Sequence, residues 1–356
     1  MPEETYNKIK KSFNSELLSK RFRSYKTIDM HTGGEPLRVI MEGLPEIDAK
    51  SVLEYRRILR DQHDYVRQVL MYEPRGHADM YGCVLTPPND DTGDFGIVFL
   101  HNEGYSTMCG HAIIAISTLA VEMQWVEVKA EQHVLEIDAP CGRITSYVDM
   151  KDGIVESVTF HCVPSFVLYK NISLEVPKLG SVKLDIAYGG AFYAYIRMED
   201  HDFPFGLDQK DCSAIIEAGM SIKKTVIESN LLIEHPFETD LSFLYGTIFT
   251  QVSQKENIDS RNVCVFADGE VDRCPTGSGV AGRMAIHYLK DGLAQGQKMR
   301  IESITDSVFE CSVIDTIAYH KHQAVIPAIT GTAYLTGVQE FLIDEHDPFQ
   351  KGFFLR

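Results

Sequence analysis

Two stretches of the 356-residue chain repeat the same order of motifs, and this internal duplication limits the folds that the sequence can adopt. The first stretch reads KTIDMHTGG at residues 26–34, and the second reads VKLDIAYGG at residues 182–190. Each is a β-patterned run that ends in a Gly-Gly pair and leads into another β-patterned run. Glycine tolerates backbone angles that a Cβ atom forbids, so each pair predicts a sharp connection between two strands.

A strand, a loop and a helix also recur in the same order in both halves. The two copies are predicted at residues 97–100, 101–107 and 108–121, and at residues 262–266, 267–274 and 275–289. The motifs of the two copies are offset by similar distances along the chain, which favours duplication over coincidence. Both predicted helices are apolar nearly all round and rich in small residues, a pattern typical of enclosed helices.

The predicted fold class is therefore α/β (α+β), with two pseudo-symmetric domains that each wrap a curved sheet around a central helix. A chain of this length also favours two domains over one. We expect an N-terminal extension at residues 1–25, a first domain at residues 26–180 and a second domain at residues 181–334. Residues 335–356 are candidates to complete the first domain.

Composition excludes several classes of partner. The chain has 34 basic and 51 acidic residues and a net charge of −17, which disfavours binding to nucleic acid or to an anionic membrane surface. No apolar run approaches the roughly 20 residues that span a bilayer, and residues 1–26 lack the apolar core of a secretory signal. Eight cysteines without a CxxC pair favour reduced thiols and a cytoplasmic location.

Cys109 opens the first predicted helix and is the leading candidate for chemistry. A helix N-terminus presents unpaired N–H groups and a positive dipole end. This field favours the thiolate, so we expect the pKa of Cys109 to fall from about 8.5 toward neutrality, where a thiol is a competent acid and base. The alternative is a small packed core residue, because free cysteine is often buried.

Thr276 occupies the matching position at the second predicted helix, next to Pro275, which suits a first helical turn. Two helix N-termini converging from two domains would form a concave site with N–H groups aimed at a carboxylate. Alternatively, Asp272, Thr276 and Ser278 only satisfy backbone donors as capping residues. Capping alone does not explain why both halves have the same arrangement.

Four segments resemble signature blocks of the proline racemase family. They are DMHTGGEPLR at residues 29–38, EPRGHADMYG at 73–82, MCGH at 108–111 and DRCPTGSG at 272–279. The resemblance runs in order from about residue 26 to the C-terminus. It implies the diaminopimelate epimerase fold, a homodimer, a small imino-acid substrate, no metal and no organic cofactor.

The resemblance also implies roles for individual residues. Cys109 would act as an acid/base, and Asp272 would meet the ring amine of the substrate. The substrate carboxylate would be held by Gly110, His111, Gly277 and Ser278.

Thr276 stands where racemases and hydroxyproline epimerases of this family carry a second acid/base, commonly cysteine. Inversion requires a second group to return the proton from the opposite face, and an unactivated alcohol is a poor proton donor. Threonine here is typical of the family's trans-3-hydroxy-L-proline dehydratases, so the sequence predicts a hydro-lyase in which Thr276 positions the substrate. The alternatives are a racemase or hydroxyproline 2-epimerase, with Cys274 as a displaced second acid, and a non-catalytic imino-acid binding protein.

Three further patterns carry less weight. Residues 277–282 satisfy the dinucleotide motif GxGxxG, but a polar loop separates them from the preceding strand. His320 and His322 fall in a β-like run, where they would share one face and could bind a metal, although a solvated face is the simpler interpretation. His31 and Glu35 flank the first Gly-Gly pair and are candidates to border the pocket.

Overall fold

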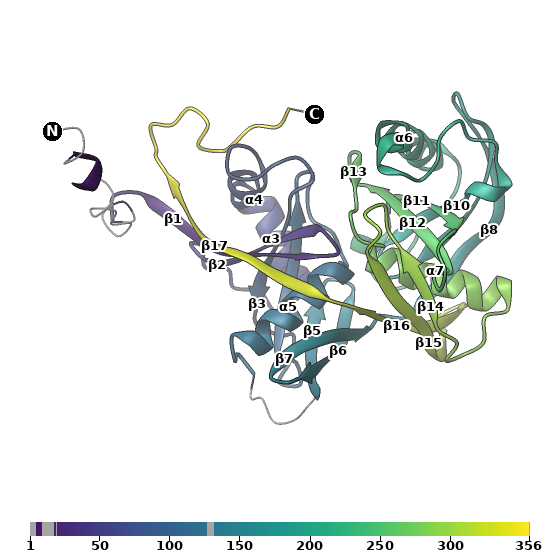
Figure 1. Cartoon of the computed structure of the whole chain (residues 1–356), viewed down its shortest axis with the longest axis horizontal. Coiled ribbons are helices and arrows are strands. Elements are labelled where there is room, and N and C mark those ends of the chain that lie inside the picture. Colours follow the sequence, from purple (N-terminus) through teal and green to yellow (C-terminus); the bar gives the residue numbers. More distant parts are fainter. Residues whose placement is uncertain (1–4, 9–17, 19, 127–131, 356) are drawn as a thin grey trace.

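The computed structural model describes residues 5–8, 18, 20–126 and 132–355. Figure 1 shows two lobes side by side, one built around helix α5 (Gly110–Glu122) and the other around helix α7 (Gly277–Ile286). Long strands run from one lobe into the other.

The first lobe contains seven consecutive strands and two helices besides α5. They are β1 (Arg23–Thr32), β2 (Glu35–Glu42), α3 (Val52–Gln62), α4 (Tyr65–Met71), β3 (Tyr81–Thr86), β4 (Phe95–His101), β5 (Gln132–Ala139), β6 (Gly142–Lys151) and β7 (Ile154–His161).

The second lobe repeats this plan. Its strands are β8 (Ser165–Val176), β9 (Gly180–Tyr188), β10 (Phe192–Arg197), β11 (Leu244–Val252), β12 (Ser260–Phe266), β13 (Glu270–Val271), β14 (Met299–Glu302), β15 (Val308–Tyr319) and β16 (His322–Gly331). Helix α6 (Cys212–Glu228) covers its outer face, and α7 continues into one π-helical turn, η4 (His287–Asp291). Short 3₁₀ turns are η1 (Met198–Asp200), η2 (Gln209–Asp211) and η3 (Thr239–Leu241).

The strands of the two lobes pair in the same order. In the first lobe, β1–β2 is antiparallel, β2–β3 parallel, β3–β4 antiparallel, β4–β5 parallel, and β5–β6 and β6–β7 antiparallel. In the second lobe, β9–β10 is antiparallel, β10–β11 parallel, β11–β12 antiparallel, β12–β14 parallel, and β14–β15 and β15–β16 antiparallel. This repeated series confirms the predicted α/β class with two similar curved sheets.

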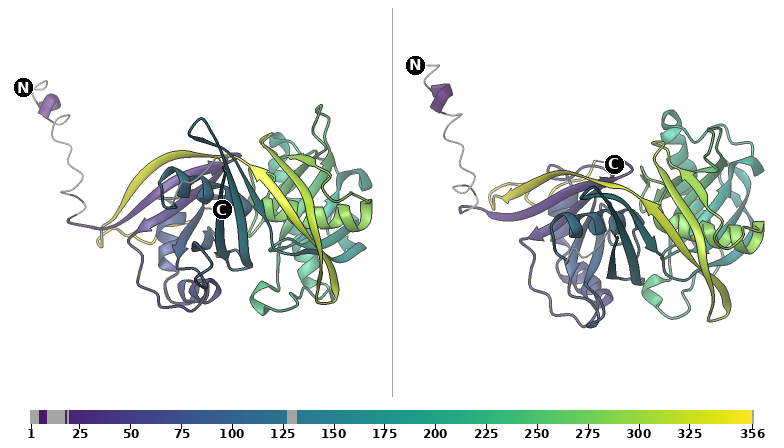
Figure 2. Two further views of the ribbon diagram at one scale, coloured as in Figure 1. Left: turned by 90° about the horizontal axis from the view of Figure 1, so that it is seen from below. Right: turned by 60° about the horizontal axis from the view of Figure 1, so that its bottom comes forward.

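Each half of the chain contributes one strand that completes the sheet of the other half. Strand β8 follows β7 in sequence but pairs with β9 and β16, and β17 (Ala333–Ile343) follows β16 but pairs along the whole of β1. Figure 2 shows β1 and β17 side by side in both views. The segment predicted to complete the first domain therefore lies against the first lobe. The boundary at residue 180 stays a prediction, because β8 precedes it in sequence yet pairs within the second sheet.

Both Gly-Gly pairs form the predicted strand connections. Gly33 and Gly34 join β1 to β2 with φ values of 60° and 89°, and Gly190 joins β9 to β10 with a φ of 91°. These positive angles are strained for residues with a Cβ atom, which explains the glycines.

The two central helices are enclosed, as their apolar sequences predict. Helix α5 packs on β1, β7 and β17, and α7 packs on the equivalent strands β9, β16 and β8. The glycines of the GxGxxG run serve this packing: a Cβ atom at Gly279 would lie 2.3 Å from Ile248 Cδ1, and one at Gly282 would lie 2.3 Å from the Tyr195 hydroxyl. The run therefore lies inside a helix packed against strands and not in an open phosphate-binding loop.

The extended arrangement expected for His320 and His322 is wrong. His320 lies in the turn between β15 and β16 with a φ of 55°, and His322 begins β16 and stacks on Phe166. The two imidazoles therefore do not follow one strand face, and the metal interpretation loses its basis.

No helix among the described residues is both long and apolar enough to cross a bilayer. All eight cysteines are free thiols, in agreement with the absence of a disulfide pattern in the sequence.

Candidate active site

The N-terminal tips of α5 and α7 meet where the two lobes join. Cys109 is the N-cap residue of α5 and Thr276 is the N-cap residue of α7, so the two residues occupy matching positions. A Cβ atom on Gly110, the first residue of α5, would lie 2.6 Å from the Cα atom of Gly277, the first residue of α7. The two tips thus converge, as the duplication predicts.

A small cavity opens beside this contact. The seven residues to which the sequence assigned catalytic or substrate-binding roles all line it: Cys109, Gly110, His111, Asp272, Thr276, Gly277 and Ser278. The structure therefore brings the candidate residues of both halves together, and their individual roles stay predictions.

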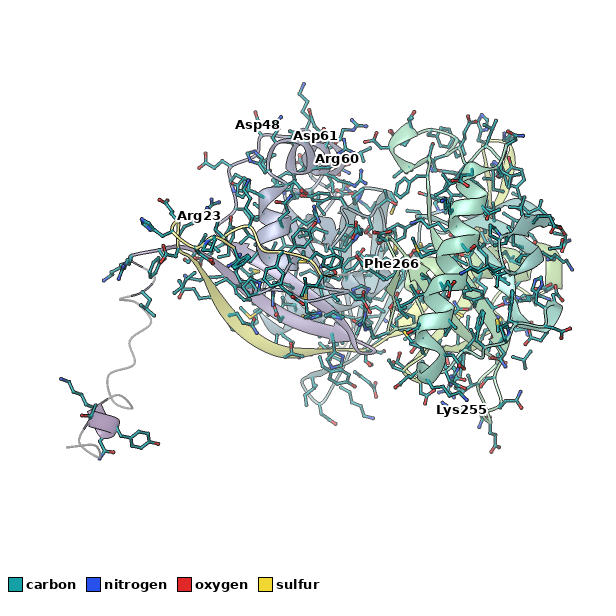
Figure 3. The ribbon with its side chains drawn as sticks, turned by 90° about the horizontal axis from the view of Figure 1, so that it is seen from above. Arg23, Asp48, Arg60, Asp61, Lys255 and Phe266 are labelled. Carbon is teal, nitrogen blue, oxygen red and sulfur yellow. The ribbon has the colours of Figure 1, made fainter. Side chains whose placement is uncertain are left out.

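Five further residues line the cavity that sequence reasoning missed. They are Tyr81, Met108, Tyr193, Tyr245 and Phe266. Phe266, labelled in Figure 3, lies at the junction of the two lobes. The sequence carried a partial signal only for Tyr81 and Met108, which fall within segments that resemble family blocks. The other three are strand residues with an apolar sequence pattern, and the direction in which their side chains point depends on the assembled sheet.

The Cys109 thiol lies beside the His111 imidazole, with Sγ 3.1 Å from Nδ1. Burial raises the pKa of Cys109 well above its usual value, and the negative charges of Asp272 and Glu35 add to the rise. The backbone N–H of Ala112 and the Tyr81 hydroxyl act in the opposite direction. The expectation of a pKa near neutrality is therefore wrong, because desolvation of the thiolate outweighs the helix N-terminus.

His111 is buried and packs its ring edge-on against Tyr81, with ring centroids 4.8 Å apart. Burial lowers the pKa of His111 to about 3, so its imidazole is neutral at physiological pH. A neutral imidazole carries one nitrogen that accepts a proton, and Nδ1 is close enough to the Cys109 thiol to do so.

Asp272 begins the loop that leads into α7, and its carboxylate accepts a hydrogen bond from the Cys274 N–H at 2.8 Å. Burial raises the pKa of Asp272, and the nearby polar groups of Cys274 and Thr276 act in the opposite direction. The Cys274 sulfur accepts the Thr276 N–H at 3.4 Å and is not among the residues that line the cavity. This placement disfavours Cys274 as a displaced second acid.

Thr276 has an unusual backbone conformation, with φ 66° and ψ 92°. A β-branched residue is strained at positive φ, and such strain persists only where the surrounding structure enforces it. Its hydroxyl oxygen is buried and has no hydrogen-bond partner among the described residues. An unpaired buried hydroxyl at a cavity wall is available to a bound substrate.

Glu35 supports the site from behind and does not line the cavity. Its carboxyl group is fully buried and accepts the Arg273 N–H at 2.8 Å, while the Arg273 guanidinium pairs with Asp79 at 2.8 Å. Burial and the nearby Asp272 carboxylate raise the pKa of Glu35 well above its usual range. His31 is also outside the cavity, and its Nδ1 accepts the Gly34 N–H at 3.2 Å.

Comparison with known proteins agrees with this geometry. The sequence profile of the family described as "Proline racemase" matches residues 27–354. Proteins named trans-3-hydroxy-L-proline dehydratase from Bacillus cereus and Colwellia psychrerythraea are each 44% identical to the chain. The alignment with the Bacillus cereus protein covers 93% of this chain and 98% of that protein. The alignment with the Colwellia psychrerythraea protein covers 94% of each. The crystal structure of a hydroxyproline epimerase from Agrobacterium vitis, with bound trans-4-hydroxy-L-proline, superimposes with a TM-score of 0.86 at 25% identity, covering 94% of this chain and 96% of that one. The chain belongs to the proline racemase family.

Proposed function

We propose that this chain is a hydro-lyase that converts trans-3-hydroxy-L-proline to Δ1-pyrroline-2-carboxylate. The observation that carries the proposal is the pair of matching N-cap positions, which hold a thiol at Cys109 and only an alcohol at Thr276. One acid/base on one face of the cavity suits elimination, whereas inversion needs a second on the opposite face. The two relatives named as dehydratases support the same reaction.

The substrate carboxylate is assigned to the convergent helix tips. Backbone N–H groups at Gly110, Gly277 and Ser278 favour an anion, because helix N-termini present unpaired donors and a positive dipole end. His111 lies beside Cys109 at the same tip, and Asp272 is assigned to the ring amine, whose positive charge matches its carboxylate.

Deprotonation of the thiol is coupled to substrate binding in this proposal. His111 Nδ1 accepts the Cys109 proton across 3.1 Å, and the adjacent substrate carboxylate stabilises the resulting imidazolium. The cationic ring amine further favours the thiolate. The low pKa of His111 and the high pKa of Cys109 in the free protein therefore change once the charged substrate fills the cavity.

The stereochemistry of the substrate explains how one thiol suffices. The 3-hydroxyl of trans-3-hydroxy-L-proline lies across the ring from the carboxylate, on the same face as the Cα hydrogen. The Cys109 thiolate removes that hydrogen, the Cα electrons form the ring double bond, and the C3–O bond breaks. The departing hydroxyl takes the proton back from the thiol and leaves as water. The enamine then tautomerises to the cyclic imine, while Thr276 positions the ring.

A homodimer, a cytoplasmic location and a reaction without metal or organic cofactor remain part of the proposal as predictions from the sequence.

The decisive experiment supplies the purified protein with trans-3-hydroxy-L-proline and detects the cyclic imine with o-aminobenzaldehyde. We expect imine formation with this substrate and unchanged optical rotation of L-proline. Loss of L-proline rotation would identify a racemase, and turnover of hydroxyproline without imine would identify an epimerase. Binding without any reaction would identify a binding protein. Each of these three results contradicts the proposal.

A further inference from the structure

We propose that a thiophilic divalent cation such as Zn²⁺ also binds beside the active-site cavity, between His111 and Asp272 of the cavity wall and Cys274 behind it, and that this ion inhibits the enzyme by competing with substrate. The inhibitory role depends on the proposed function, whereas the binding site depends only on geometry.

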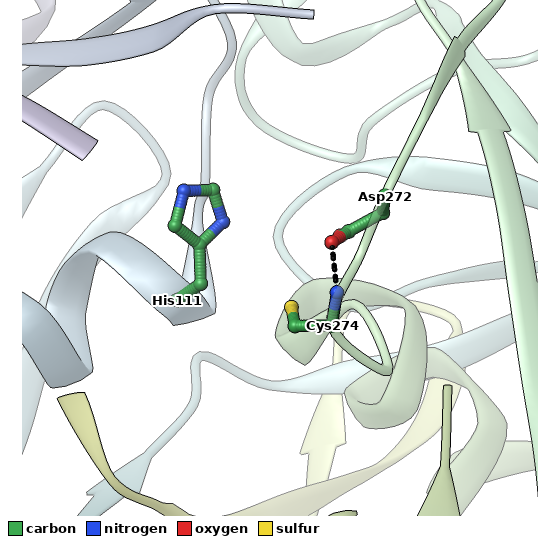
Figure 4. Close-up of side chains that lie close together, drawn as sticks. All are labelled: His111, Asp272 and Cys274. Atoms are coloured by element: carbon green, nitrogen blue, oxygen red, sulfur yellow. Dashed lines mark hydrogen bonds between the residues drawn. The ribbon is translucent and has the colours of Figure 1, made fainter. Parts of the chain in front are cut away.

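The three side chains form a compact buried group. One ligand atom from each, an imidazole nitrogen, a carboxylate oxygen and a thiol sulfur, lies within 4.8 Å of the other two. Figure 4 shows His111 on the first-lobe side, facing Asp272 and Cys274 on the second-lobe loop. Nitrogen, oxygen and sulfur together form a ligand set suited to Zn²⁺ and Co²⁺ and unsuited to Mg²⁺ or Ca²⁺.

A fourth ligand is within reach. The Cys109 sulfur lies 3.1 Å from His111 Nδ1 and 3.6 Å from Nε2. In a tetrahedral zinc site with bond lengths of about 2.0–2.3 Å, neighbouring ligand atoms are about 3.3–3.8 Å apart. Side-chain rotations that shift the ligand atoms by about 1 Å would therefore close the observed group around an ion.

The surroundings favour a cation at this point. His111, Asp272 and Cys274 are all buried, so an ion held between them is shielded from bulk water. The Asp272 carboxyl group interacts electrostatically with the Glu35 carboxyl group, so a second acidic side chain lies near the proposed ion.

The loop already orients two of the ligands. Asp272 accepts the Cys274 N–H at 2.8 Å, and the Cys274 sulfur accepts the Thr276 N–H at 3.4 Å. Hydrogen bonds of this kind fix the direction of a ligand and stabilise its anionic form. Because His111 and Asp272 are also assigned to the substrate, an ion held by them excludes the imino acid.

The test uses the metal-free protein and Co²⁺ as a spectroscopic probe. We expect a sulfur-to-cobalt charge-transfer band in the near ultraviolet that Zn²⁺ displaces, and competitive inhibition of imine formation by Zn²⁺. Cys274→Ser and His111→Gln should each weaken Co²⁺ binding at least tenfold. Cys212→Ser, which removes a half-buried thiol at the start of α6 that does not line the cavity, should retain wild-type binding.

Absence of the cobalt band, or wild-type Co²⁺ affinity in both Cys274→Ser and His111→Gln, would overturn the proposal. Measuring two variants keeps the test decisive if one of them does not fold. Because the band does not require turnover, the metal site stands or falls independently of the dehydratase activity. A protein that binds Co²⁺ through Cys274 but forms no imine would refute the function and retain the site.

Discussion

Gly110 and Gly277 are in backbone contact at the tips of α5 and α7, where a Cβ atom on either residue would lie 2.6–2.7 Å from the Cα atom of the other. This contact sets the distance between the two N-cap residues, Cys109 and Thr276. The distance from Cys109 to the opposite cavity wall therefore depends on the absence of a side chain at both Gly110 and Gly277.

Substitution of Gly110 by alanine should separate the two helix tips. We expect Gly110→Ala to reduce imine formation at least tenfold and to destabilise the protein by about 1–3 kcal/mol, the usual cost of overpacking a core. Activity assays and urea unfolding measure the two effects. Gly104→Ala is the control, because no atom lies within 4 Å of a Cβ placed there. Wild-type activity in Gly110→Ala would contradict the close contact.

Removal of the Cys109 thiol should abolish chemistry and spare binding. We expect Cys109→Ser to lower kcat by at least about a hundredfold, the typical contribution of a positioned acid/base. The imine assay measures the loss, and calorimetric titration with the substrate checks that binding persists. Cys212→Ser should behave as wild type, and comparable activity in both variants would exclude Cys109 as the base.

A second thiol at position 276 should allow the enzyme to invert the Cα configuration of L-proline. We expect Thr276→Cys to exchange the Cα hydrogen of L-proline with solvent deuterium and to form D-proline, because the new thiol faces Cys109 across the cavity. Proton NMR in deuterated water measures the exchange. Thr276→Ser retains an alcohol and should form no D-proline. Failure of Thr276→Cys to exchange would count against the division of roles between the two tips.

Glu35 should act as an anchor for the Arg273 backbone. Burial and the nearby Asp272 carboxylate raise its pKa well above the usual range. We expect Glu35→Gln, which keeps an acceptor for the Arg273 N–H, to stay within about threefold of wild-type kcat/KM. Glu35→Ala leaves that buried N–H unpaired and should cost about 1–3 kcal/mol of stability. Equal stability of the two variants would contradict the anchoring role.

His235 should make stability fall as the pH falls. Burial lowers its folded pKa to about 4, and its Nδ1 accepts the Glu238 N–H at 3.1 Å. Above about pH 6.5 the side chain is neutral in both states and has no linkage effect. As the pH falls from 6.5 toward 4 only the unfolded state gains the proton, which removes about 2 kcal/mol at pH 5. Urea unfolding at pH 7 and pH 5 should show a smaller loss in His235→Gln; an equal loss would refute the assignment.

Local sequence was sufficient to predict the features of this protein that depend on short segments. The Gly-Gly connections follow from backbone angles that only glycine adopts easily, and the enclosed character of α5 and α7 follows from their apolar residues. Duplication of these segments placed Cys109 and Thr276 at equivalent helix starts. The choice between a thiol and an alcohol at those two positions is a property of the sequence alone.

Tertiary structure decided which distant segments meet and how much water they exclude. The pairing of β17 with β1 joins the two ends of the chain, and no local pattern encodes such a partner. The helix N-terminus suggested a low pKa for Cys109, but burial raised it, because desolvation depends on every residue that covers the thiol. The cavity walls at Tyr193 and Tyr245 likewise came from strands whose orientation exists only in the assembled sheets.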